Sequence, residues 1–241
     1  MNAASKTRQE AQPAYVLHSY PFRETSLVVE IFSRNFGRLA LVARGARRPK
    51  SAVRGVLLAF QPLQLAWFGK SDLRTLHRAE WQGGQPQLKG MALICGFYLN
   101  ELILRLLPRD DPHERLFLRY EETLRVLGTQ NDFAATLRRF EKYLLQELGY
   151  ALTLDRDAES GEPVQPERAY QFVIERGPVA HPAGKNGVEL RGKTLLDIAA
   201  DNYTDPLTLQ QSKALMRVLL AHYLDGQPMH TRQLLKDLQQ R

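Results

Sequence analysis

Basic residues are concentrated in one stretch near the N-terminus, between positions 34 and 54. This stretch carries seven cations and no acidic residue: Arg34, Arg38, Arg44, Arg47, Arg48, Lys50 and Arg54. Gly45 and Pro49 interrupt its second half, which predicts a loop after a strand, because proline cannot donate to a strand ladder. Several cations on a strand end and its loop can meet several phosphates at once. We interpret the run as a polyanion-binding surface, with a solvated, solubilising face as the alternative.

A second stretch matches the phosphate-binding loop of nucleotide hydrolases. Residues 187–194, GVELRGKT, satisfy the pattern G-x-x-x-x-G-K-[ST], in which backbone amides and the lysine hold phosphates. That loop works only after a buried strand, and residues 179–186 do not read as one. Glu189 would also place a negative charge beside the phosphates. Nucleotide binding at Gly187 to Thr194 is therefore only a minor alternative.

The other chemistry-bearing residues favour neither a catalytic nor a metal site. The six histidines include no helical i, i+4 pair, and the single Cys95 excludes a cysteine-rich zinc site. Asp155, Asp157 and Glu159 alternate as in a calcium loop, but the residues that follow break the ligand pattern. No G-x-S-x-G nucleophile motif occurs. We therefore expect a non-enzymatic protein with no cofactor and no metal.

Two arginines stand between apolar residues in the sequence LRRFE, residues 137–141. The guanidinium groups of Arg138 and Arg139 present rigid forks that suit a carboxylate. Beside an apolar pocket they could hold an acidic peptide that ends in an aromatic residue and a free carboxylate. A surface ion pair with Glu141 or Glu147 is the alternative on these residues alone.

The basic run belongs to a segment that reads as short strands separated by turns. Strands are predicted at residues 15–20, 27–33, 38–44, 61–68 and 73–80, with a short helix or irregular pass at 53–60. Five strands in so short a segment indicate a small barrel. A basic barrel of this kind fits the OB-fold, which binds single strands through phosphate contacts and base stacking. Two or three of its aromatic residues could be exposed stackers, and the sequence leaves open which ones.

Beyond a linker at 82–86 the apolar period changes from two to 3.6. Helices are predicted at 88–107, at 112–127 with Asp110 or Asp111 as N-cap, from 133 to 148, at 193–200, at 206–224 and from 231. A short strand at 170–174 is expected to pair near Val179. The predicted fold is α+β, with a disordered tail at 1–13, a five-stranded OB-fold barrel at 14–82 and a helical domain at 86–241 that carries an irregular insertion at 151–190.

The net charge of +7 on the 241 residues is unevenly distributed. Residues 1–83 hold 13 Lys and Arg against 5 Asp and Glu, whereas residues 84–241 hold 20 against 21. The excess therefore lies in the barrel segment and favours an acidic partner there. The sequence has no apolar stretch of membrane-spanning length and no signal-peptide pattern, so we expect a cytoplasmic protein that does not contact a membrane.

In addition to these patterns, the sequence resembles the RecO family of bacterial recombination mediators. The resemblance covers nearly the whole chain, through short motifs in order: AYVLHS at 14–19, RETSL at 23–27, LVARGAR at 41–47, FYLNEL at 97–102, LRRFE at 137–141, LGY at 148–150 and HYLDGQP at 222–228. It implies an OB-fold followed by a helical domain. It also implies binding to single- and double-stranded DNA, strand annealing and, with RecR, loading of RecA onto DNA coated by the single-stranded-DNA-binding protein, SSB, in the RecF pathway at the nucleoid.

The same resemblance implies that the helical domain docks the acidic, aromatic C-terminal tail of SSB. It suggests Arg138 as a contact residue, with Arg139 and Phe140 as further candidates. Many RecO proteins carry a four-cysteine zinc site after the Leu-Gly-Tyr motif, but residues 151–177 contain no cysteine, so this chain is similar to the zinc-free branch. A basic OB-fold protein that binds RNA remains another alternative, which a preference for RNA through its 2′-hydroxyl would distinguish.

Overall fold

The computed structural model describes residues 8–150, 152–180, 187–231 and 233. The chain divides into two compact units, one made of residues 1–131 and 229–241 and the other of residues 132–228. This division falls later in the chain than the boundary predicted at residues 82–86, because the two helices that follow the linker belong to the same unit as the barrel.

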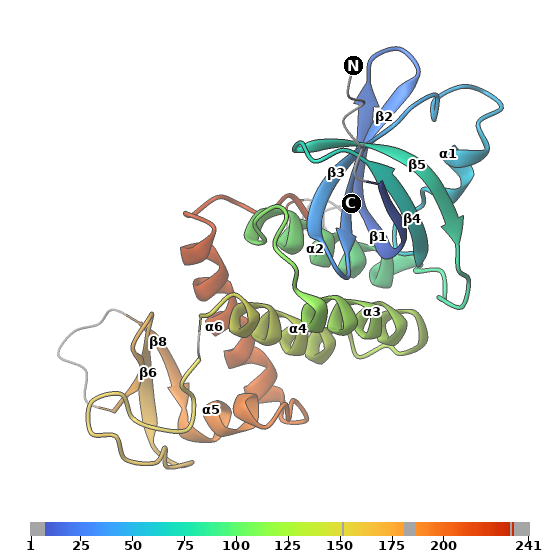
Figure 1. Cartoon of the computed structure of the whole chain (residues 1–241). Coiled ribbons are helices and arrows are strands. Elements are labelled where there is room, and N and C mark those ends of the chain that lie inside the picture. Colours follow the sequence, from blue (N-terminus) through green and yellow to red (C-terminus); the bar gives the residue numbers. More distant parts are fainter. Residues whose placement is uncertain (1–7, 151, 181–186, 232, 234–241) are drawn as a thin grey trace. The chain divides into compact units, whose positions relative to one another are not determined.

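The first unit contains a closed five-stranded barrel (Figure 1). Its strands are β1 (Arg8–Phe22), β2 (Ser26–Ser33), β3 (Gly37–Ala43), β4 (Leu63–Phe68) and β5 (Leu73–Trp81), in the order β1-β2-β3-β5-β4. Neighbouring strands are antiparallel except β3 and β5, whose parallel pairing closes the barrel. Alternate residues point inward and form its core, among them Val29, Ile31, Leu39, Leu41 and Trp67. The predicted OB-type barrel is confirmed.

Strand β1 is longer than the sequence suggests, which corrects part of the expected N-terminal tail. The predicted tail includes residues 8–13, yet Arg8 pairs with Phe68 and Gln12 with Leu65 on β4. These polar residues carry no apolar alternation, so only the partner strand, through backbone hydrogen bonds, makes them a strand. The rest of the expected tail, residues 1–7, lies outside the described residues.

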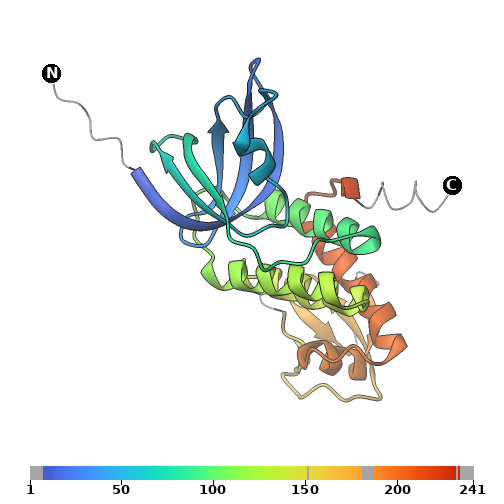
Figure 2. The ribbon, with the colours of Figure 1, turned by 90° about the vertical axis from the view of Figure 1, so that its right-hand side faces the viewer.

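Helices α2 (Gly90–Leu106) and α3 (Glu114–Thr129) pack against one end of the barrel (Figures 1 and 2). The contact is partly polar, because the buried Asn100 side chain donates to the Leu17 carbonyl at 2.8 Å and accepts from the Tyr120 hydroxyl at 2.5 Å. Phe32 of β2 packs against Phe117 of α3, with ring centroids 5.5 Å apart. The barrel and these two helices therefore share one buried interface.

The loop between α2 and α3 is tied to the barrel, and this corrects the predicted helix cap. Helix α3 follows His113, so neither Asp110 nor Asp111 is its N-cap. Asp110 instead forms an ion pair with Arg74 of β5 at 2.5 Å, and its amide donates to the Arg38 carbonyl at 2.9 Å. A nearby guanidinium on the barrel thus binds the carboxylate that the sequence suggested for capping.

The chain returns to the first unit at Met229, where Glu101 of α2 receives it. The Glu101 carboxylate accepts hydrogen bonds from the His230 amide (2.7 Å), the Thr231 amide (2.9 Å) and the Thr231 hydroxyl (2.7 Å). The helix predicted from residue 231 lies mostly outside the described residues.

The second unit contains α4 (Phe133–Glu147), α5 (Gly192–Ala199), α6 (Pro206–Tyr223) and a small sheet. The sheet has the order β7-β6-β8, formed by β6 (Ala169–Val173), β7 (Gly177–Val179) and β8 (Val188–Arg191). Asp132 and Asp205 cap α4 and α6. The expected pairing near Val179 is confirmed, because Gln171 lies opposite Val179. Strand β8 was not predicted. No helix in the described part of the chain is long and apolar enough to cross a membrane.

Within the segment predicted as irregular, Asp157 organises a loop. Its buried carboxylate accepts hydrogen bonds from the amides of Glu159 (2.8 Å), Ser160 (3.1 Å) and Ala180 (2.8 Å). Burial raises the pKa of this carboxyl, but the three amides outweigh it and the net pKa lies below the ordinary value. This loop is therefore held by one carboxylate, rather than being the freely solvated loop expected from the sequence.

Candidate nucleic-acid interface

A cleft of about 690 Å³ lies on the outside of the barrel. The β1–β2 turn, the end of β3 with its following loop, and the start of β5 surround it. Three arginines, Arg23, Arg44 and Arg48, line the cleft together with the acidic Glu24. Its lining therefore combines guanidinium groups with residues of the barrel strands and turns.

The β1–β2 turn and the loop after β3 are fixed to one another by Arg47. The Arg47 amide donates to the Thr25 carbonyl at 2.9 Å, and its guanidinium donates to the carbonyls of Arg23 (3.2 Å) and Glu24 (3.3 Å). Gly45 supplies the left-handed backbone, at a φ of 69°, that turns the chain out of β3. Arg47 therefore acts as a brace between the two walls of the cleft.

The cations around the cleft have no acidic partners within the described residues. Four of these cations are exposed: Arg44, Arg48, Lys50 and Arg54, of which Arg54 lies on the short helix α1 (Ala52–Val56). None of the four forms an ion pair with a described residue, and neither does Arg23. Unneutralised cations on a shared surface raise the local potential and attract a polyanion. Of the seven predicted residues, Arg44 and Arg48 line the cleft and Arg47 joins its walls, although the guanidinium of Arg47 is occupied by carbonyls.

The other two predicted residues, Arg34 and Arg38, lie elsewhere and are used within the protein. Arg34 forms an ion pair with Glu114 at the start of α3. Arg38 donates to the Leu107 carbonyl at 3.0 Å and lies 3.7 Å from the buried Glu30 carboxylate. Burial lowers the pKa of Arg38, Glu30 raises it, and nearby Arg109 lowers it again, with a net decrease. Both guanidinium groups are therefore less available to a ligand than those at the cleft.

The cleft also has an apolar side that the basic run does not include. Phe22, Val42 and Leu73 line it, and Leu73 is 39% exposed although it is a large apolar residue. The Arg23 guanidinium lies 5.2 Å from the centre of the Phe22 ring. Sequence reasoning missed Arg23 and Leu73, because each is separated from the basic run and only barrel closure brings them beside it. The alternation along β1 could have indicated Phe22.

Comparison with known proteins places this barrel and the helices after it in one family. The family models described as "Recombination protein O N terminal" and "Recombination protein O C terminal" match residues 8–84 and 88–233. The chain belongs to the RecO family. It is 62% identical to a DNA repair protein RecO of Nitrosospira multiformis, over 98% of both chains, and 55% identical to one of Dechloromonas aromatica, over the full length of both. The resemblance noted from the sequence is thereby confirmed.

In this RecO protein, the residues suggested for a peptide tail are largely enclosed. Arg138 is 8% exposed and pairs with the fully buried Glu141, and Phe140 is 0% exposed. Arg139 is half-buried; its guanidinium donates to the Asp201 carbonyl and lies 5.3 Å from the Tyr203 ring centre. Phe140 therefore offers no surface to a ligand, whereas Arg139 keeps an accessible edge.

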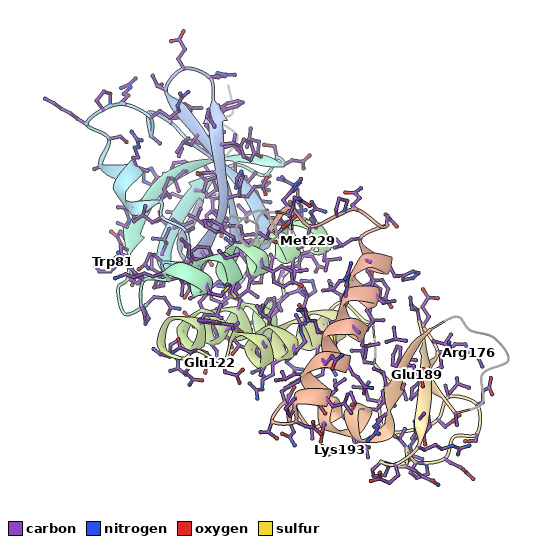
Figure 3. The ribbon with its side chains drawn as sticks, turned by 180° about the vertical axis from the view of Figure 1, so that it is seen from behind. Trp81, Glu122, Arg176, Glu189, Lys193 and Met229 are labelled. Atoms are coloured by element: carbon purple, nitrogen blue, oxygen red, sulfur yellow. The ribbon has the colours of Figure 1, made fainter. Side chains whose placement is uncertain are left out.

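Residues 187–194, which match the nucleotide-binding pattern, do not form a loop that could surround phosphates. Val188–Arg191 is strand β8, and Leu190 pairs with Tyr170 of β6. Lys193 lies at the start of α5 (Figure 3) and forms ion pairs with Asp197 at 2.5 Å and Asp205 at 3.1 Å. These hydrogen bonds raise the pKa of Lys193. The pattern therefore matches by chance in a strand-to-helix junction.

Proposed function

We propose that this RecO protein binds single- and double-stranded DNA through the barrel cleft and anneals complementary strands. In the same proposal it acts with RecR to load RecA onto SSB-coated single strands at the nucleoid. The observation that carries the proposal is that three arginines, Arg23, Arg44 and Arg48, line the cleft and have no acidic partner among the described residues. Membership in a family of DNA repair proteins supports the choice of DNA over other polyanions.

The proposed mechanism is physical and needs no bond-making step. Annealing is slowed by repulsion between two polyanions and by SSB, which occupies the bases. Arginines at the cleft replace counterions condensed on the phosphates, and the release of those counterions favours binding. A strand whose charge is partly neutralised can approach its complement more closely, so the barrel lowers the first barrier.

Capture of the SSB tail would lower the barrier that arises because SSB occupies the bases, since it keeps the protein close to coated DNA. Binding to one part of a complex raises the effective concentration of the other binding site, often to the millimolar range for short linkers. Arg139 is the best supported contact in the LRRFE motif, because it is accessible and lies against Tyr203. Arg138 would first have to leave Glu141, and exposing that buried carboxylate is costly.

The test is annealing of two complementary oligonucleotides, each coated with SSB, without any nucleotide. The wild-type protein is compared on intact SSB and on SSB without its C-terminal tail, and Arg139→Gln is compared with Arg176→Gln. Arg176 is an exposed arginine of the same unit whose ion-pair partner is Glu159, which makes it a matched control (Figure 3).

We expect annealing that requires the tail and is slowed by Arg139→Gln but not by Arg176→Gln. Annealing of naked strands alone would keep the DNA-binding barrel and reject tail docking. If the protein anneals neither SSB-coated nor naked strands, the mediator role is rejected. A matched RNA strand serves as a further control, and tighter binding to RNA than to DNA would favour the RNA-binding alternative.

A further inference from the structure

Strand β1 places three aromatic rings on the outer face of the barrel, in the direction of the cleft. His18, Tyr20 and Phe22 alternate along the strand and lie opposite Glu30, Val28 and Ser26 of β2. None of these six belongs to the apolar cluster inside the barrel, which takes the intervening Val29 and Ile31 of β2 instead, although Val28 and Glu30 are themselves buried. Alternate residues on a strand share one face. The three rings therefore form a row, which we call the β1 ring row (His18, Tyr20 and Phe22).

The β1 ring row is accessible and is ordered by its neighbours. Tyr20 is 40% exposed, and its hydroxyl donates to the Glu30 carboxylate at 3.2 Å, which fixes the ring without covering it. The His18 and Tyr20 ring centres lie 5.7 Å apart. Phe22, at the other end of the row, lines the cleft itself. Exposed aromatic rings such as these, on the face of a barrel, are suited to stack with a ligand.

The row and the cations run side by side, so one ligand can use both. Arg44 and Arg48 line the cleft beside Phe22, and the two-residue spacing of the rings is about 6.6 Å along a strand. At its other end the row reaches Glu30, whose carboxylate pairs with two guanidinium groups, those of Arg38 and Arg109. The cleft-lining arginines that have no acidic partner among the described residues therefore lie at the Phe22 end of the row, where a negatively charged chain is favoured.

A duplex cannot use such a row, whereas a single strand can. Bases in a duplex are stacked about 3.4 Å apart and present no free face. Bases of a single strand can separate and stack on aromatic side chains while their phosphates meet cations. The geometry points to Tyr20 and Phe22 as a stacking platform that makes the barrel prefer single-stranded to double-stranded DNA. This inference rests on the proposed function, because it assigns the strand type to the same cleft.

The experiment measures fluorescence anisotropy with a labelled oligothymidylate and with a hairpin duplex of equal phosphate number. The variants are Tyr20→Leu and Phe22→Leu, which keep an apolar side chain and remove the ring. Tyr20→Phe keeps the ring and loses only the bond to Glu30. Trp81→Leu is the matched control, because Trp81 is 61% exposed at the far end of β5 from the cleft (Figure 3).

We expect each ring removal to weaken single-strand binding roughly 5- to 150-fold, the range reported for losing one base-stacking contact. Duplex affinity and the salt dependence of single-strand binding should change little, because no phosphate contact is lost. Tyr20→Phe and Trp81→Leu should bind like the wild type. The fluorescence of a 2-aminopurine base in the strand should be quenched on binding to the wild type, and quenched less on binding to Tyr20→Leu. This measurement reports stacking even if the Phe22→Leu variant does not fold.

Equal losses for single strand and duplex, or no loss for either, would overturn the stacking platform while leaving DNA binding in place. Failure of the wild type to bind either DNA would instead overturn the proposed function and the platform together. The two failures are therefore distinguishable in the same titration.

Discussion

The seven cations predicted from the sequence should not contribute equally to DNA binding, and their salt dependence can separate them. Arg44 and Arg48 line the cleft without acidic partners among the described residues, whereas Arg34 is paired with Glu114. An arginine that contacts a phosphate releases a counterion, and one already paired in the protein releases fewer. We therefore expect Arg44→Gln and Arg48→Gln to flatten the salt dependence, and Arg34→Gln to leave it nearly unchanged.

The magnitude follows from counterion release. Each phosphate contact contributes about 0.7 to the slope of log K against log salt for a single strand. Loss of one contact should lower the slope by about 0.7, so that a fourfold rise in salt weakens the variant about 2.6-fold less than the wild type. The double variant Arg44→Gln with Arg48→Gln should lose about 1.4 in slope, a difference of about 7-fold over the same range.

The assay is a titration of labelled single-stranded DNA at four salt concentrations between about 50 and 200 mM, the range in which counterion effects are large. Arg47→Gln adds a further comparison. Its guanidinium bonds to the carbonyls of Arg23 and Glu24, so its loss should loosen the cleft walls and weaken binding with a smaller slope change than Arg48→Gln. Equal slope changes for Arg34→Gln and Arg48→Gln would refute the placement of the DNA-binding surface at the cleft.

Three further predictions concern the scaffold. Asn100→Leu removes the donor to the Leu17 carbonyl and should cost about 1–3 kcal/mol of unfolding free energy, measured by urea denaturation. Because the pKa of Asp157 is depressed, its carboxylate stabilises the fold above about pH 4 and this contribution is lost as pH falls through the lower folded pKa. The stability gap between wild type and Asp157→Asn should therefore be wider at pH 6 than at pH 3, and an equal gap would contradict this role. Lys193→Ala should leave DNA binding and any nucleotide turnover unchanged, whereas loss of a DNA-stimulated ATPase would revive the nucleotide alternative.

The elements of this chain could be predicted from local patterns, because those patterns reflect local forces. Alternation along residues 27–33 and 38–44 indicated strands whose inward faces carry Val29, Ile31 and Leu41. The helices predicted from 133 and at 206–224 begin where Asp132 and Asp205 each satisfy a free amide of the helix's first turn. Residues 8–13 and β8 could not be predicted in this way, because their backbone hydrogen bonds go to β4 and β6 and not to any local pattern.

The sequence by itself determined the composition of the interface: an excess of cations near residues 34–54 with no interleaved acid, which is a matter of residue type alone. Only the tertiary structure decided which of those cations are free. Contacts between distant residues paired Arg34 with Glu114 and Arg38 with Glu30, and brought Arg23 and Leu73 beside Arg44. The physical reason is that an ion pair depends on distance in space, and barrel closure sets that distance independently of spacing along the chain.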